Sequence, residues 1–382
     1  MNPAGGGVAT AVDALSRAEI ALGHPVEIAC LDEPASPWLQ NLPYPVHAFC
    51  PTLFRSYGWC PAFARWLRLN IQRYEVATVE GLWQYQGLAV WHAARAAQKP
   101  YVVYPHGMLD PWFQRAYPRK HLKKMLYWKL GGHRVLRDAR AVAFTTEEEM
   151  RLAENSFQPW LARGVISPLG VQLPSGNSAD RAKLWQQRFP LLAGKKYLLF
   201  LGRIDPKKGV EMLLAAYASI YSFAIASGTA PVLVLAGPEF HPGFSSLCRN
   251  SMQQLGLRDG VDVLWAGHLD HDLKWAALEA ADALVLPSHQ ENFGYVVAEA
   301  LAVGTPVLIS ERVNLWREVV ADGAGLAAPD DLDGTRRLLE AHRAWTMDDR
   351  RRIANAARQC FMARFQIEAA ARRQIEVLNG AN

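Results

Sequence analysis

Cysteine is scarce in this chain of 382 residues, and its spacing argues against two kinds of site. The five cysteines form an odd set without a Cys-x-x-Cys pair. We therefore expect reduced thiols, as in cytosolic proteins, and neither a disulfide framework nor a zinc centre. They are Cys30, Cys50, Cys60, Cys248 and Cys360.

Long apolar runs are also lacking. The N-terminus has no charged segment followed by an apolar core, so no signal peptide is predicted. The most apolar long segment, residues 212–236, is broken by Ser227-Gly228-Thr229 and Pro231. It predicts a buried helix followed by a strand rather than a membrane span, and the expected location is the cytoplasm.

No strong charge bias is present. The net charge of +5 suits phosphate ligands or an anionic membrane surface. No RNA- or DNA-binding motif accompanies it, so nucleic acid is not an expected partner. Half of the residues are hydrophobic, and the length is sufficient for two α/β domains.

One strand–loop–helix–strand unit organises the rest of the chain. The apolar run 283–286 predicts a buried strand that Pro287 ends. An Ala-rich segment predicts a helix from about Tyr295 to Val303, and Gly304 suits its left-handed C-terminus. The next strand is expected at 307–309. Open α/β sheets are built from such units.

Two carboxylates mark this unit, Glu291 in the loop and Glu299 in the helix. With seven residues between them, both can face the carboxyl edge of the sheet, where such folds bind ligands. The backbone N–H groups around Phe293, Gly294 and Tyr295 begin the helix and suit a phosphate. The alternative is a solvated Glu291 and a Glu299 paired with a surface cation; the apolar surroundings of Glu299 in the sequence disfavour it.

This pattern, with Phe-Gly after the first Glu and Glu-Ala-Leu-Ala-x-Gly-x-Pro-Val around the second, resembles the donor-site signature of family 4 glycosyltransferases. The resemblance implies an α/β fold of GT-B architecture, two Rossmann-like doubly wound domains facing across a cleft. It implies that Glu291 is catalytic and holds donor-sugar hydroxyls, that Glu299 holds the ribose, and that Asn292, Phe293 and Gly294 bind the donor. No cofactor and no metal are expected, because the nucleotide-diphosphate sugar is a substrate.

The N-terminal glycines are similar to the opening of that family. Gly6 and Gly7 precede a predicted helix that ends at Gly23, at matching spacing. The resemblance implies that they approach the donor diphosphate or the acceptor; a flexible terminus is the alternative. The family has a strand before these glycines, whereas only residues 1–4 precede the glycine cluster here. We therefore expect a first strand that is truncated or absent.

A histidine follows the predicted strand 101–104. The loop 105–112, Pro-His-Gly-Met-Leu-Asp-Pro-Trp, is similar to a family loop, which implies that His106 contacts the donor sugar near the reacting centre. The alternative is a structural hydrogen bond. Asp110 is assigned to the acceptor. Family members often carry His where Glu80 stands, so Glu80 receives no role.

The second domain opens with a predicted strand, 197–201, followed by a turn that carries cations. Arg203 can bind a diphosphate bidentately and Lys208 supplies a point charge, unless the turn is merely solvated. The Gly-Arg, four residues, Lys-Gly spacing resembles the diphosphate loop of the family. Asp270-His271-Asp272 imitates a metal motif, but its place before a helix predicts capping.

Two segments mix arginine and lysine with aromatic and aliphatic residues, 51–75 and 115–140. Such amphipathic basic helices can lie on an anionic membrane or contact a lipid-linked acceptor. The alternative is packing on their own domain with the cations in solvent. The first interpretation predicts a peripheral position at the inner face of the cell membrane.

The expected domains are an acceptor-side domain over 1–175, a linker over 176–194, a nucleotide-sugar domain over 195–360, and a C-terminal helix over 361–382 that crosses back to the first domain. The predicted activity is retaining transfer of a hexose from a UDP- or GDP-linked donor to a hydroxyl of a saccharide or lipid-linked saccharide, in surface polysaccharide or glycolipid synthesis. Alternatives are a sugar-nucleotide epimerase or hydrolase, or a non-catalytic partner subunit that binds nucleotide or lipid; the intact charged residues argue against the latter.

Overall fold

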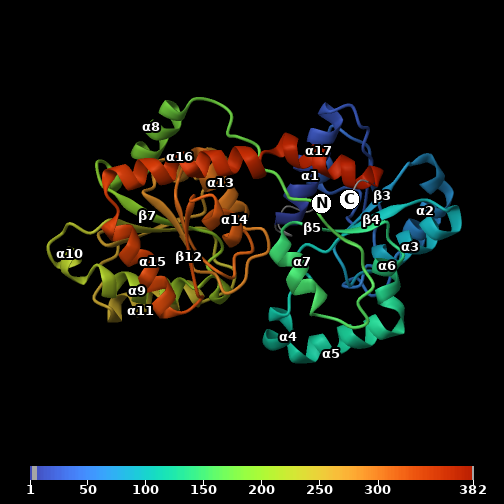
Figure 1. Ribbon diagram of the computed structural model, residues 1–382, viewed down its shortest axis with the longest axis horizontal. Helices are drawn as coiled ribbons and strands as arrows, with labels where there is room; N and C mark the ends of the chain where they lie inside the picture. Colours follow the sequence, from blue (N-terminus) through green and yellow to red (C-terminus); the bar gives the residue numbers. More distant parts are fainter. Residues whose placement is uncertain (2–6, 381–382) are drawn as a thin grey trace. The chain divides into compact units, whose positions relative to one another are not determined.

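The computed structural model describes Met1 and residues 7–380, which divide into two compact units. The first comprises Met1–Gln172 and Arg364–Asn382, and the second Leu173–Ala363. Both are α/β units with parallel sheets (Figure 1).

The second unit contains a six-stranded sheet in the order β12-β11-β10-β7-β8-β9, all parallel. This is the doubly wound Rossmann order, in which the first strand along the chain, here β7, lies beside the fourth, here β10. Strands β8 and β9 extend the sheet on one side of this pair, and β11 and β12 extend it on the other; the strand order reverses at this point. The two strands are buried along their whole length, as continuous apolar runs predict for a parallel sheet. The strands are β7 Tyr197–Leu201, β8 Val232–Ala236, β9 Val263–Gly267, β10 Ala283–Leu286, β11 Val307–Ser310 and β12 Gly325–Ala328.

Helices cover both faces of this sheet. In Figure 1, α9, α10, α11 and α15 lie on one side and α8, α13 and α16 on the other, and α12 packs against α8 and α13. Asp270 caps α12 by accepting from the N–H of Leu273, at 2.9 Å, which confirms the predicted capping. The helices are α8 Ser178–Arg188, α9 Val210–Ile220, α10 Ser222–Ala226, α11 Phe244–Gln254, α12 His271–Ala280, α13 Tyr295–Val303, α14 Trp316–Ala321, α15 Leu332–Ala344 and α16 Met347–Arg364, with short 3-10 turns η5 Pro190–Leu192 and η6 Pro206–Lys208.

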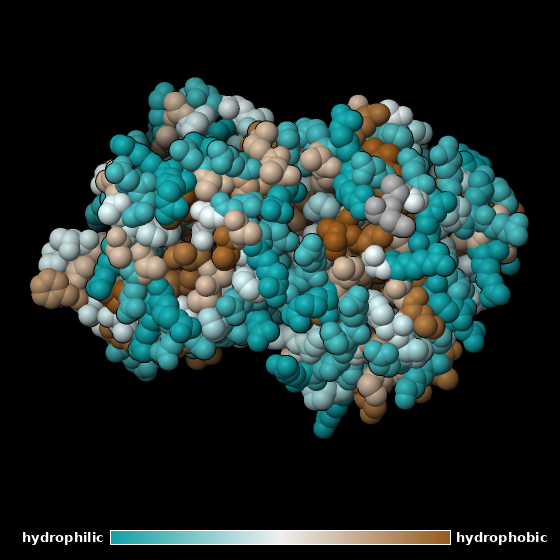
Figure 2. Space-filling view, in the orientation of Figure 1, coloured by the Kyte–Doolittle hydropathy of each residue, from teal (hydrophilic) through white to brown (hydrophobic). Residues whose placement is uncertain are grey.

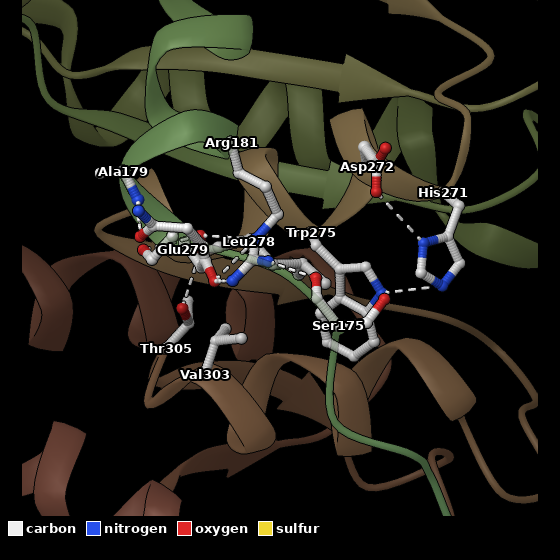
Figure 3. A network of polar contacts seen from close by, with 12 residues as sticks. Ser175, Ala179, Arg181, His271, Asp272, Trp275, Leu278, Glu279, Val303 and Thr305 are labelled. Carbon is white, nitrogen blue, oxygen red and sulfur yellow. Dashed lines mark hydrogen bonds and ion pairs between the residues drawn. The ribbon is translucent and has the colours of Figure 1, made fainter.

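A partly buried ion pair fixes α8 to α12 (Figure 3). The Arg181 guanidinium donates to both carboxylate oxygens of Glu279, 2.6 Å at the shortest, and also to the carbonyl of Ser175. The Thr305 hydroxyl donates to the carbonyl of Leu278, 2.6 Å away. These contacts hold α12, the helix that carries Lys274, in a fixed position at the sheet.

The first unit has two separate parallel sheets. Strands β3 Ala77–Glu80, β4 Tyr101–Tyr104, β5 Ala141–Phe144 and β6 Gly164–Ile166 pair in sequence order, while β1 Ile28–Cys30 and β2 Val46–Ala48 pair only with each other. Among Met1 and residues 7–380, α1 Gly7–Ala21 is the first element, and no strand precedes it.

Alternating side chains of β4 bury both faces of the four-stranded sheet. Val103 belongs to a large cluster with α2 and α3, whereas Val102 and Tyr104 pack with Val377 of the last helix. That helix also contacts α1, so the chain end completes the first unit. The helices are α2 Pro61–Asn70, α3 Tyr85–Ala97, α4 Trp112–Ala116, α5 Pro118–Tyr127, α6 His133–Arg137, α7 Glu147–Glu154 and α17 Ile367–Asn379, with short turns η2 Pro37–Leu39, η3 Ile71–Arg73 and η4 Trp128–Gly132.

Of the helices in the described part of the chain, none has both the length and the apolarity needed to cross a membrane.

Candidate functional site

Two loops of the second unit leave the sheet at the point where the strand order reverses. Residues 202–209 follow β7, and residues 287–294 follow the neighbouring strand β10. Because both strands run parallel, both loops emerge at the same carboxyl edge, which is where doubly wound folds bind ligands. The two stretches predicted to bind the donor are therefore brought together by topology alone.

An ion pair joins these loops. Lys208 Nζ contacts Glu291 Oε2, and the two side chains are only 11% and 23% exposed. The backbone supports the pair, since the His289 N–H donates to the carbonyl of Lys207 at 2.8 Å. Glu291 is itself held by its own backbone, which donates to Arg312 and accepts from Asn314. The catalytic and diphosphate-binding residues of the prediction thus touch one another.

The charge state of Lys208 is set by opposing effects. Burial lowers the pKa of Lys208 to about 7, and the Lys207 and Arg203 cations act in the same direction. The touching Glu291 carboxylate favours the ammonium form. The contact with Glu291 therefore opposes the loss of the Lys208 proton that burial favours.

Arg203 is exposed and lies over the ring of Phe240, with 4.1 Å between its guanidinium carbon and the ring centroid. Phe240 follows β8 and was not singled out by the sequence, because no local motif surrounds it. The stacking orients the guanidinium at the same sheet edge while leaving its hydrogen-bond donors for an anion.

Glycines allow the backbone segments at this edge to approach closely. Gly237, with φ +138°, passes so near Gly202 that an added Cβ would lie 1.9 Å from its carbonyl oxygen. Gly294, with φ +73°, precedes α13, which begins without a side-chain cap. The N-terminus of α13, which carries the positive end of the helix dipole, therefore lies at the end of the loop 287–294, as predicted from Gly294. Phe293 is 3% exposed and packs inward, whereas Asn292 accepts a hydrogen bond from Asn314 at 3.4 Å.

Glu299 lies one turn into α13 and is paired with Lys274 of α12, with 2.5 Å between Nζ and Oε1. The side chains are 14% and 27% exposed, so this pair is partly buried rather than a solvated surface pair. The sequence did not indicate Lys274, which lies 25 residues away and in no recognisable motif. Each predicted donor carboxylate is thus held by a lysine from another element.

The first unit has a separate group of polar residues at the ends of its own strands. His106, just after β4, contacts Glu80 at the end of β3, with 2.6 Å between Nε2 and Oε2. Glu149 of α7 accepts from the Gly107 N–H at 2.6 Å, and the Thr146 hydroxyl caps that helix by accepting from the Glu149 N–H. The structural hydrogen bond considered for His106 is present, and its partner is Glu80, to which sequence reasoning gave no role.

The remaining predicted residues are less informative. Asp110 accepts from the Trp112 N–H at 2.8 Å and shapes its own loop, and its acceptor role stays a prediction. Gly7 begins α1 and is exposed, whereas Gly6 lies outside the described residues. Within Met1 and residues 7–380, no group of three or more His, Cys, Asp or Glu side chains is arranged to hold a metal ion.

Two family models match the chain, one on each unit. The model of glycosyl transferases group 1 matches residues 183–359, and the model of a glycosyl transferase 4-like domain matches residues 6–170.

Curated relatives and solved structures agree with the family models. The D-inositol 3-phosphate glycosyltransferase of Kineococcus radiotolerans is 31% identical over 246 residues, 61% of this chain and 53% of that protein. The chain thus spans about half the length of the curated relatives it matches.

Among solved structures, a sucrose-phosphate synthase from Thermosynechococcus elongatus is 22% identical over 98% of this chain and 93% of that chain, with a TM-score of 0.76. Anabaena HepE in complex with UDP and glucose is 18% identical over 99% and 96%, with a TM-score of 0.75. At these identities the likeness establishes the fold.

Gly209 offers a test of how tightly the two loops must pack. A Cβ there would lie 2.5 Å from the Pro287 carbonyl oxygen. Gly209→Ala should therefore lower the free energy of unfolding by more than the ~1–2 kcal/mol that a left-handed alanine costs. Gly228→Ala is the matched control, because the φ of Gly228 is +71° and that of Gly209 is +70°, and no atom lies within 4 Å of a Cβ added at Gly228. Urea denaturation measures both; equal losses would contradict tight packing of the loops.

Proposed function

Because this chain belongs to the family 4 glycosyltransferases of GT-B architecture, we propose that it transfers a hexose from a nucleotide-diphosphate sugar, UDP- or GDP-linked, to a hydroxyl acceptor with retention of anomeric configuration. The observation that carries the proposal is the pairing of Lys208 with Glu291 where the strand order reverses, beside Arg203 and the start of α13. It supplies both signs of charge that the reaction needs.

Transfer breaks the bond between the anomeric carbon and the diphosphate, so negative charge grows on the departing phosphate. Arg203, Lys208 and the start of α13 supply positive charge or N–H donors for it. When the diphosphate arrives, it can share Lys208 with Glu291, because a lysine ammonium has three donors. Glu291 then holds sugar hydroxyls and stabilises positive charge at the anomeric carbon.

The acceptor hydroxyl attacks the anomeric carbon on the same face from which the diphosphate leaves. Its proton passes to the departing phosphate oxygen, which balances the step and needs no further base. In this proposal the reaction is metal-independent, since Arg203 and Lys208 supply the positive charge that the leaving group requires.

The relatives guide the choice of donor and product class. UDP and glucose are bound in the Anabaena neighbour, and WaaG, a further structure with the same fold, is described as a glycosyltransferase involved in lipopolysaccharide biosynthesis. We propose a saccharide or lipid-linked saccharide acceptor, in surface polysaccharide or glycolipid synthesis. An epimerase or hydrolase would release product without an acceptor, and analysis of products in acceptor-free reactions distinguishes it.

The first unit has a surface suited to a membrane on α5 and the following turn. Leu122, Leu126 and Leu130 recur every four residues and are 65%, 60% and 77% exposed. Exposed cations surround them: Arg119, Lys120, Lys123 and Lys129. Figure 2 shows brown apolar residues among teal ones at the edge where Figure 1 places α5. We propose that this surface, the α5 patch, holds the protein peripherally on an anionic membrane.

Helix α2, which lies within segment 51–75, fits that role less well. Trp66, within α2, packs on Phe49 and His47 of its own unit. Phe63 and Leu67 of the same helix are buried. The alternative of packing on the domain therefore describes this helix better, and the proposal rests on α5.

Donor binding is tested by a thermal-shift panel of UDP, GDP and ADP with their sugar conjugates. A nucleotide at about 100 times its Kd should raise the free energy of unfolding of the wild type by about 2.7 kcal/mol. The same concentration should raise that of Arg203→Ala by much less. Arg249→Ala is the matched control, because Arg249 also lies over a ring, that of Trp265, at 4.5 Å.

Lys208→Ala should lower kcat on the order of 10²–10³-fold. No shift with any nucleotide, or near wild-type turnover by Glu291→Ala, would contradict the proposed site.

Membrane attachment is tested by flotation with phosphatidylcholine vesicles, with and without phosphatidylglycerol. The wild type should float with the anionic vesicles, and replacement of the three leucines of the α5 patch by serine should abolish flotation. Serine at Leu184, Leu191 and Leu247, exposed leucines of the second unit, is the control and should leave flotation unchanged. Equal flotation of both triple variants would refute the α5 patch as the attachment site.

A further inference from the structure

His106 occupies a constrained and buried position. Its side chain is 4% exposed, and its φ of +50° lies in the left-handed region that non-glycine residues seldom adopt. Such strain persists only where surrounding contacts enforce it, and it is concentrated at functional sites. The contacts that hold the loop after β4 therefore show which position of the His106 ring is maintained.

Glu149 enforces the loop from one side. One of its oxygens accepts from the Gly107 N–H at 2.6 Å. The other accepts from the N–H and the hydroxyl of Thr145, both at 2.7 Å. Every oxygen of this carboxylate is thus used to fasten the loop after β4 to the junction of β5 and α7.

Glu80 fixes the imidazole from the other side. It is the last residue of β3 and pairs in register with Tyr104, the last residue of β4. Two adjacent parallel strands therefore place the carboxylate and the histidine at the same edge, with 2.6 Å between Oε2 and Nε2. This bond occupies Nε2, so a hydrogen bond from the ring to a ligand would have to use Nδ1.

The surrounding charges favour a cationic ring. Burial lowers the pKa of His106, but the hydrogen bond to Glu80 and the charges of Glu80 and Glu149 outweigh it and raise the pKa above its usual value. Glu19 of α1 is also near Glu80 and adds negative charge when ionised.

Two further groups lie nearby. The Tyr104 ring stacks on His106, with 6.1 Å between centroids. Arg373 of α17 is engaged by the Ile166 carbonyl at 3.1 Å and by Glu376 at 3.0 Å. Tyr104 is uncharged at neutral pH, and the positive charge of Arg373 is offset by its ion pair with Glu376.

We propose that Glu80 is a positioning residue that keeps His106 as an imidazolium whose Nδ1–H donates a hydrogen bond to a substrate oxygen. The inference rests on the proposed glycosyl transfer and deepens it. In this arrangement His106 is a donor rather than a base, because both ring nitrogens carry protons. A charge-assisted donor of this kind is stronger than a neutral one. Removal of the Glu80 charge leaves burial to dominate, and the ring becomes neutral within the working pH range.

The test follows the protonation of His106 directly by ¹H–¹⁵N NMR of the histidine rings across pH. Glu80→Gln should lower the pKa of His106 by at least about one unit, while Glu80→Asp should retain most of the elevated value. The matched control is Glu27→Gln. It removes the partner of another Glu–His pair of the same unit, with 2.8 Å between Glu27 Oε2 and His47 Nε2. It should leave His106 unchanged.

Turnover gives the second readout. In Glu80→Gln the alkaline limb of the pH profile of kcat should move to lower pH. At a pH above both limbs, kcat of the variant should then be about tenfold below that of the wild type for each pH unit of the shift. A His106 pKa equal to that of the wild type, or an unmoved limb despite a lowered pKa, overturns the proposal. The NMR result needs no turnover, so failure to find any donor would count against the proposed function and not against the role of Glu80.

Discussion

The reversal of strand order between β7 and β10 is the constraint on which the second unit depends. At this point the chain leaves two neighbouring parallel strands toward opposite sides of the sheet, and the loops after both strands begin at the same carboxyl edge. Lys208 comes from one loop and Glu291 from the other, and their contact bridges this point. A diphosphate and a sugar require opposite charges close together, and this arrangement supplies them from elements 83 residues apart.

Close backbone packing makes that arrangement possible. Gly209 and Gly237 have left-handed φ values and lie against the carbonyls of Pro287 and Gly202, where a side chain would not fit. Backbone atoms therefore hold the loop after β7 against the segments after β8 and β10, which restricts movement of the backbone that carries Arg203 and Lys208. A site that stabilises a leaving group benefits from this rigidity, because its charges need not reorganise during the reaction.

Local pattern determined what could be predicted from sequence. The helix expected from Tyr295 to Val303 is α13 with those bounds, and the predicted capping by Asp270 is present, since each depends on neighbouring residues. Phe240 under Arg203 and Lys274 beside Glu299 were missed, because these contacts join separate elements. Glu80 was dismissed for departing from a family pattern, yet strand register places it against His106.

The central claim, that the donor diphosphate binds where β7 and β10 end, is tested most directly by a crystal structure of the protein with UDP or GDP. The account predicts the phosphates within hydrogen-bond distance of Arg203 and Lys208, near the start of α13, with the ribose at Glu299. A nucleotide bound at another edge of the sheet, with the Lys208–Glu291 pair undisturbed and remote from the phosphates, would contradict it.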